Sequence, residues 1–94
     1  MPESEHWQTK ETTELFKVIL KLKSIDECEK FFRDLCTLAE IDEMSKRWQA
    51  VKMINRGIQF RMIAEKLSLS TTTVARVAHW FHHGEGGYRL MINR

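Results

Sequence analysis

Apolar positions recur with a helical period along almost the whole chain. Between Glu11 and Lys23, six apolar residues cover an arc of roughly 200° at about 100° per residue. This arc is wider than the single stripe that one core-facing helix needs. Ser24 and Glu27 then form an S-x-x-E capping-box pattern, which predicts a second, broadly apolar helix through about Ala39.

The helical pattern continues to the C-terminus in shorter segments. A third helix is predicted over about Asp42–Arg56, and Gly57 follows where a glycine commonly ends a helix. A short helix over about Gln59–Leu67 and another over about Thr71–His83 flank a tight turn, and a glycine-rich "GEGG" precedes an apolar tail, Tyr88–Ile92. The periodicity predicts an all-α fold.

The two early helices carry more apolar surface than so short a chain can cover. We therefore expect a homodimer in which these helices pack against the partner chain, with a compact monomeric bundle as the alternative. The predicted organisation is a single helical domain over residues 1–94. It comprises dimerisation helices over about 7–56, a helix-turn-helix over 59–83 and a C-terminal tail over 84–94.

Two apolar quartets repeat one spacing. The spacing i, i+3, i+4, i+7 is shared by Phe60, Ile63, Ala64 and Leu67, and by Val74, Val77, Ala78 and Phe81. In the turn between them Leu69 can fill the angle, and Ala64 is small enough for two steeply crossing helices to approach. This is the helix-turn-helix pattern, whose second helix enters the DNA major groove. A plain helical hairpin with a polar outer face is the alternative.

The outward face of the second helix carries the candidate DNA contacts. Ser70 is a good N-cap, so the three threonines that follow need no capping explanation. At 100° per residue, Thr72, Arg76, His79 and His83 share the line opposite the apolar side. Hydroxyls at a helix tip can contact phosphates or base edges, and Arg76 can reach either. The predicted DNA-binding residues are Arg61, Lys66, Ser70, Thr71, Thr72, Thr73, Arg76 and His79, with Lys52 as a further backbone contact.

Charge is divided unevenly along the chain. Residues 1–43 hold 6 Lys/Arg and 11 Asp/Glu, a balance of −5, whereas residues 44–94 hold 9 and 2, a balance of +7. A basic half of this kind indicates a polyanion partner, and double-stranded DNA comes first. A merely solvated basic surface is the alternative.

Compartment and membrane signals point in one direction. No apolar run approaches the roughly 20 residues that span a bilayer, so no membrane association is expected. The polar, acidic N-terminus is unlike a signal peptide, and the cytoplasm is the expected location. Cys28 and Cys36 are too far apart on one helix to bridge within it, which favours free thiols.

Catalytic and metal signatures are weak. No nucleophile elbow, phosphate-binding glycine loop or useful carboxylate pair is present, so we expect no enzyme activity. His79 and His83 have the i, i+4 spacing of a zinc chelate, but only Glu85 lies near them as a further ligand. Favourable placement of His82 and His83 at a helix C-terminus is the simpler interpretation, and no metal is predicted.

Three segments resemble the Trp repressor family, and especially its YerC/YecD-type branch of small Trp repressor-like proteins. They are "FFRDLCTLAEIDEMSKRWQAVKMINRG", "IAEKLSLSTTTVARV" and "HGEGGY", which lie between about Phe31 and Tyr88. The resemblance implies an intertwined homodimer that presents two helix-turn-helix units to a palindromic operator, as a transcriptional repressor. A dimeric protein-interaction module that does not bind DNA is the alternative function.

The resemblance also implies a site for L-tryptophan. Arg47 and Arg76 match the two arginines that hold this ligand in the family, and Thr37 matches a pocket threonine. Val77, however, stands where the family has a glycine, and Trp80 stands where it has a serine. These bulky residues would crowd an indole, and Trp80 could fill the site with its own ring. We therefore expect DNA binding without tryptophan.

Overall fold

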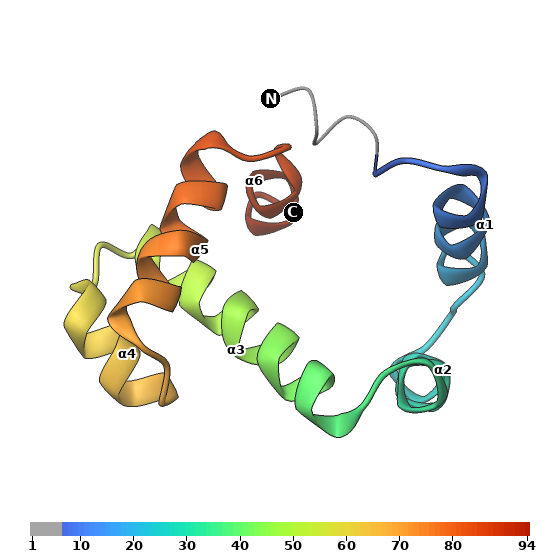
Figure 1. Cartoon of the computed structure of the whole chain (residues 1–94), viewed down its shortest axis with the longest axis horizontal. Coiled ribbons are helices and arrows are strands. Elements are labelled where there is room, and N and C mark those ends of the chain that lie inside the picture. Colours follow the sequence, from blue (N-terminus) through green and yellow to red (C-terminus); the bar gives the residue numbers. More distant parts are fainter. Residues whose placement is uncertain (1–6) are drawn as a thin grey trace. The chain divides into compact units, whose positions relative to one another are not determined.

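A computed structural model describes residues 7–94, and in this range it contains only α-helices (Figure 1). The helices are α1 Lys10–Ile19, α2 Ile25–Leu35, α3 Leu38–Asn55, α4 Phe60–Leu67, α5 Thr71–His83 and α6 Gly87–Ile92. The chain divides into two compact units, and the second begins at Thr37. No helix in the described range is long and apolar enough to cross a membrane. The all-α prediction is confirmed.

The first unit consists of α1 and α2, and neither helix buries a residue. Thr9 and Thr12 form a reciprocal capping box at the start of α1. At α2 the Ser24 hydroxyl accepts from the Glu27 N–H at 3.1 Å, as predicted, but the Glu27 carboxylate accepts from the Lys23 N–H, at 2.8 Å. The caps define both helices, but within residues 7–94 no residue of either helix is fully buried.

The boundary between α2 and α3 differs from the prediction of one helix through about Ala39. Helix α2 ends at Leu35, and Cys36 is extended. Thr37 then begins α3 with its own capping box: its hydroxyl accepts from the Glu40 N–H at 3.1 Å, and its N–H donates to the Glu40 carboxylate at 2.8 Å. The T-x-x-E pattern of Thr37 and Glu40 is the sequence signal that separates the two helices.

Gly57 ends α3 and redirects the chain into α4. Its φ of +81° lies in the left-handed region, which a glycine adopts without a Cβ clash. The Gly57 N–H donates to the Ile54 carbonyl at 2.9 Å and the Ile58 N–H to the Met53 carbonyl at 3.1 Å. This pair of bonds is a Schellman motif, so the predicted C-terminal glycine is confirmed.

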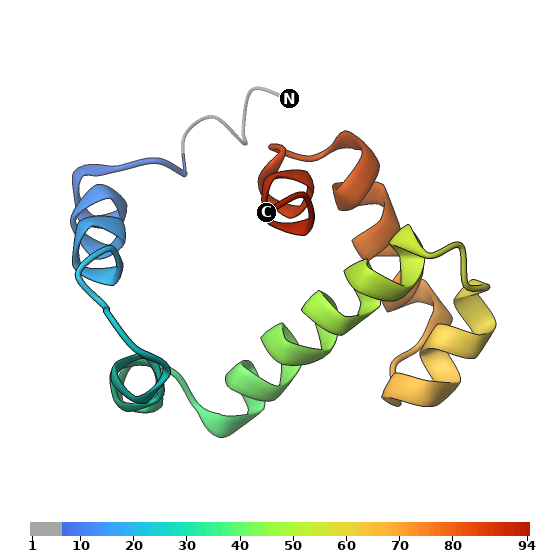
Figure 2. The ribbon, with the colours of Figure 1, turned by 180° about the vertical axis from the view of Figure 1, so that it is seen from behind.

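The core of the second unit lies where α3, α4 and α5 meet. Val51, Ile63 and Val74, one from each helix, are fully buried. Figure 2 shows α4 and α5 beside the C-terminal part of α3, and all three helices pack on one another. The predicted buried face of α4 is correct at Ile63 and Ala64 but not at Phe60, which remains 42% exposed. Helix α5 is buried at all four predicted positions: Val74, Val77, Ala78 and Phe81.

The C-terminal tail forms a helix that the sequence pattern did not indicate. Helix α6 begins after Gly86, whose φ is +94°, and it packs against both α5 and α3. Tyr88 and Ile92 of this helix contact the core and are partly buried. The tail is therefore part of the second unit's packing.

Candidate nucleic-acid interface

Helix α4, the turn and helix α5 form a helix-turn-helix. The turn begins at Ser68, whose φ is +56°, and Leu69 is partly buried against the core at the angle between the helices. The Ser70 hydroxyl accepts from the Thr73 N–H at 3.0 Å and lies 2.9 Å from the Thr73 hydroxyl, to which it can donate. Ser70 is therefore the N-cap of α5, as predicted.

The three threonines at the start of α5 have different surroundings. Thr71 and Thr72 are exposed, and within residues 7–94 no hydrogen bond holds their hydroxyls. Thr73 is half-buried, and its hydroxyl lies within the Ser70 cap. The first two threonines thus present hydroxyls to the outside, whereas the third contributes to the start of the helix.

Arg76 and His79 lie one and two turns beyond Thr72 on the exposed side of α5. Both side chains are exposed, while Val77 and Phe81 on the other side are buried. Helical periodicity explains this arrangement, because residues three and four apart share a face. The structure therefore brings Thr72, Arg76 and His79 together along one exposed line.

Neighbouring helices also carry cations. Arg61 and Lys66 on α4 are exposed, and Lys52 on α3 is half-buried. Within the described range the ion pairs of the second unit are those of Asp42 with Lys46 at 3.2 Å and of Glu43 with Arg47 at 3.1 Å. The cations of the helix-turn-helix are not neutralised by such pairs, which suits a surface for phosphates.

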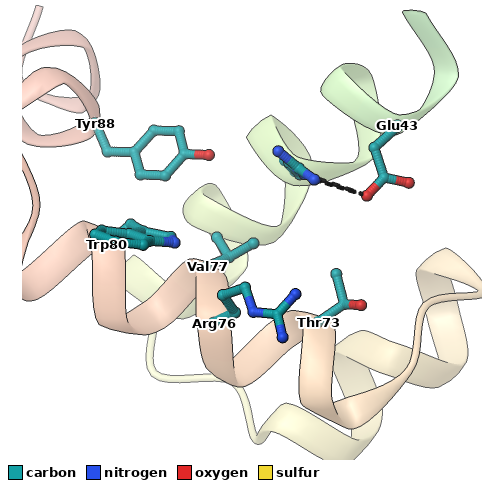
Figure 3. A pocket seen from close by; sticks show the side chains of 7 residues that line it. Glu43, Thr73, Arg76, Val77, Trp80 and Tyr88 are labelled. Atoms are coloured by element: carbon teal, nitrogen blue, oxygen red, sulfur yellow. Dashed lines mark hydrogen bonds and ion pairs between the residues drawn. The ribbon is translucent and has the colours of Figure 1, made fainter. Parts of the chain in front are cut away.

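A pocket lies between α3 and α5, and Arg76 of the exposed line is one of its lining residues (Figure 3). It measures about 80 Å³ and is lined by Glu43, Arg47, Thr73, Arg76, Val77, Trp80 and Tyr88. The structure thus brings together Arg47 and Arg76, the two predicted ligand arginines. Thr37 does not line this pocket, and its hydroxyl instead caps α3.

Aromatic and polar groups occupy different parts of the pocket. In Figure 3, Trp80 and Tyr88 lie on one side, while Glu43, Thr73 and Arg76 lie toward the other. Sequence reasoning missed Glu43 and Tyr88. The E-x-x-x-R spacing of Glu43 and Arg47, which pairs them on one helix face, could have indicated the first. Tyr88 had no such signal, because its position depends on how α6 folds back.

The histidines at the end of α5 lie close together. The ring centres of His79 and His83 are 5.2 Å apart, and those of His82 and His83 are 6.3 Å apart. No group of three or more metal-binding side chains occurs among residues 7–94. The pair of His79 and His83 offers two ligands where zinc takes four.

Comparisons with known proteins agree with this architecture. The model of the Trp repressor protein family matches residues 10–94. The uncharacterised protein YerC of Bacillus subtilis strain 168 is 35% identical over 85 residues, which cover 90% of this chain and 82% of that protein.

Two crystal structures share the fold. A TrpR-like protein from Eubacterium eligens ATCC 27750 has a TM-score of 0.88 and 38% identity, covering 93% of this chain and 90% of the other. A candidate Trp repressor from Staphylococcus aureus has a TM-score of 0.89 and 37% identity, with 96% and 90% covered.

Proposed function

The chain belongs to the Trp repressor protein family, and we propose that it is a sequence-specific DNA-binding transcriptional regulator that acts as a repressor. The family consists of regulators rather than enzymes. The observation that carries the proposal is the exposed line of Thr72, Arg76 and His79 on the second helix of the helix-turn-helix. Such a helix reads base edges in the major groove, and its N-terminal residues make the contacts.

Contacts to the DNA backbone would come from both helices of the motif. Arg61 and Lys66 on α4 are exposed cations that can approach phosphates. The first turn of α5 offers the exposed Thr71 hydroxyl and helix N-terminal amides to a further phosphate, whereas the Ser70 hydroxyl is engaged in the cap. The logarithm of the DNA association constant should then fall by about 0.9 for each phosphate neutralised when the salt concentration rises tenfold.

The proposed active form is a homodimer on a palindromic operator. No residue of α1 or α2 is fully buried within one chain, and Leu20 and Ile25 are 85% and 78% exposed. A second copy that covers these helices would relate two reading helices by a two-fold axis. Half-sites about 34 Å apart would match them.

The proposed location of the protein is the cytoplasm.

Tryptophan is not required in this proposal. Val77 and Trp80 both line the pocket, which at about 80 Å³ is well below the roughly 300–1,000 Å³ of ordinary small-molecule sites. Trp80 lies along its wall and is 53% exposed, so the ring narrows the pocket from one side. Calorimetric titration with L-tryptophan should give no saturable heat, and a saturable curve would contradict this part.

A protein-interaction module is the second candidate function. Leu90 and Met91 on α6 are exposed apolar residues of the second unit, and they could dock a protein partner. Under this alternative DNA would be irrelevant. Arg76→Ala separates the two functions, because only a DNA-binding protein should lose DNA affinity with this change.

Selection of bound sequences from random double-stranded DNA, with and without L-tryptophan, tests the proposal. We expect the same palindromic motif from the selection with L-tryptophan and from the selection without it. Recovery of no motif at low salt would contradict the proposed function. A motif only in the tryptophan arm would keep DNA binding and reject the ligand-independent form. The Arg76→Ala variant, run in parallel, controls for retention by non-specific charge.

A further inference from the structure

Helix α6 packs between α5, the proposed DNA-reading helix, and the long helix α3. It has only six residues, yet it packs against both α5 and α3. Tyr88 and Ile92 contact the core, and the Arg89 guanidinium carbon lies 5.2 Å from the centre of the buried Phe81 ring. A helix this short is not stable alone in water, so its helical form depends on these contacts.

The loop before α6 turns the chain sharply back. The Gly84 N–H donates to the Trp80 carbonyl at 2.9 Å, and a Cβ at Gly84 would lie only 2.4 Å from that oxygen. Gly86 follows with a φ of +94°. Glycine at both positions permits a close return, which brings Tyr88 to the same pocket as Trp80.

Tyr88 lines two hollows along α5. The first is the pocket of about 80 Å³ between α3 and α5, which Tyr88 lines from α6. The second is an open hollow of about 400 Å³, lined by Trp80, Gly84, Glu85, Gly87 and Tyr88. Tyr88 and Trp80 line both. Removal of the Tyr88 ring would therefore open the pocket toward the second hollow.

Helix α5 packs directly on α3, and two further helices, α4 and α6, support it at different places along its length. Helix α4 packs against it beside Ile63 and Ala64, and α6 packs against it further along, near Phe81. Arg76, a proposed DNA contact, shares the first pocket with Tyr88. The orientation of Arg76 therefore depends on how firmly α5 is held against α3.

We propose that Tyr88 is a positioning residue that holds α5 in its DNA-reading orientation without any small molecule. Its ring, beside Trp80, braces the C-terminal half of α5 against α3 from within the chain. This inference rests on the proposed DNA-binding function. If the brace is lost, only a fraction of molecules present α5 correctly, and the apparent Kd for DNA rises by the inverse of that fraction.

Three variants of the full chain test the brace. Tyr88→Ala should raise the Kd for the selected operator about tenfold or more, because a competent fraction of about one tenth gives that factor. Tyr88→Phe keeps the ring and should stay within about twofold of the unaltered protein. Leu90→Ala, at an exposed position of the same helix, is the matched control and should also stay within about twofold. Fluorescence anisotropy measures the Kd, and circular dichroism and sedimentation check folding and assembly.

Two outcomes would overturn the inference. They are unaltered DNA affinity in Tyr88→Ala and a loss in Tyr88→Phe equal to that in Tyr88→Ala. If the unaltered protein binds no DNA at low salt, the proposed function itself fails, and with it the basis of the brace. The unaltered protein, measured first, therefore distinguishes the two failures.

Discussion

The two units of the chain use apolar residues in opposite ways. In the second unit, α3, α4, α5 and α6 converge on a core whose centre is fully buried at Val51, Ile63 and Val74. In the first unit, α1 and α2 have well-formed N-caps and many apolar side chains, but none of these side chains is fully buried. Local signals are thus sufficient to define helices in both units, whereas among residues 7–94 only the second unit forms a fully buried core from a single chain.

Helix formation and core formation thus have separate requirements. Capping residues satisfy the free N–H groups of a helix end wherever the helix lies. Burial of an apolar face needs a second surface, and most helical stability in proteins comes from such packing. The first unit therefore points to a partner, while the second presents the candidate DNA-reading surface.

The largest expected effect comes from a charge placed on the apolar side of α1. Phe16→Asp should shift the protein from dimer to monomer, because an unpaired carboxylate buried in an interface costs about 3–5 kcal/mol. Sedimentation equilibrium measures the shift. Lys17→Asp places the same carboxylate on the polar side of α1 and should leave assembly unchanged. A dimer that withstands Phe16→Asp would contradict the role assigned to the first unit.

A smaller effect is expected at the reading helix. Arg76→Ala should weaken operator binding by about 1–3 kcal/mol, or roughly 5- to 150-fold, through loss of a base or phosphate contact. Lys21→Ala removes one positive charge from the first unit and should change the affinity little. Anisotropy titrations at several salt concentrations compare the two. Equal losses would mean that net charge, rather than the α5 surface, controls binding.

The boundary between the units gives a prediction about stability. Thr37→Ala removes the capping box of α3 and should lower the free energy of unfolding by about 1 kcal/mol. Ser45, within the same helix, only donates its hydroxyl to the Ile41 carbonyl at 2.8 Å, and Ser45→Ala should be neutral or slightly stabilising. Urea unfolding measures both. Equal effects would show that the cap does not define this boundary.

The smallest effects distinguish neighbouring threonines on α5. Thr72→Val should lower operator affinity about two- to fivefold, as expected for loss of one neutral hydrogen bond of about 0.5–1 kcal/mol, without changing stability. Thr73→Val should do the reverse, because the Thr73 hydroxyl lies within the Ser70 cap. Anisotropy and urea unfolding of each variant provide the check. The opposite assignment would mean that the third threonine, rather than the second, faces DNA.

The fold was predictable from the sequence wherever local chemistry specifies it. The period of α5, its Ser70 cap and the Gly57 terminus are local features, and the structure confirms them. The predicted long second helix failed because a capping box at Thr37 outweighs continuous apolar periodicity. Helix α6 escaped notice because its six residues become helical only through contact with α3 and α5.

The candidate site was predictable to a similar depth. Helical geometry identified the exposed line through Thr72, Arg76 and His79, because one helix determines it. The resemblance to the Trp repressor family indicated Arg47 and Arg76 as pocket neighbours. Tyr88 depends on a chain reversal at two glycines, which no local period encodes.

The absence of buried residues in α1 and α2 has a consequence for how much regulator a cell contains. If a second copy completes folding, the fraction of folded protein depends on chain concentration, because binding of the second copy stabilises the folded state alone. Single chains with bare apolar helices would then be the form that proteases remove first. Below a threshold rate of synthesis the operator would stay empty, and above it occupancy would rise steeply. The bare helices would thus link gene dosage to the sharpness of the response.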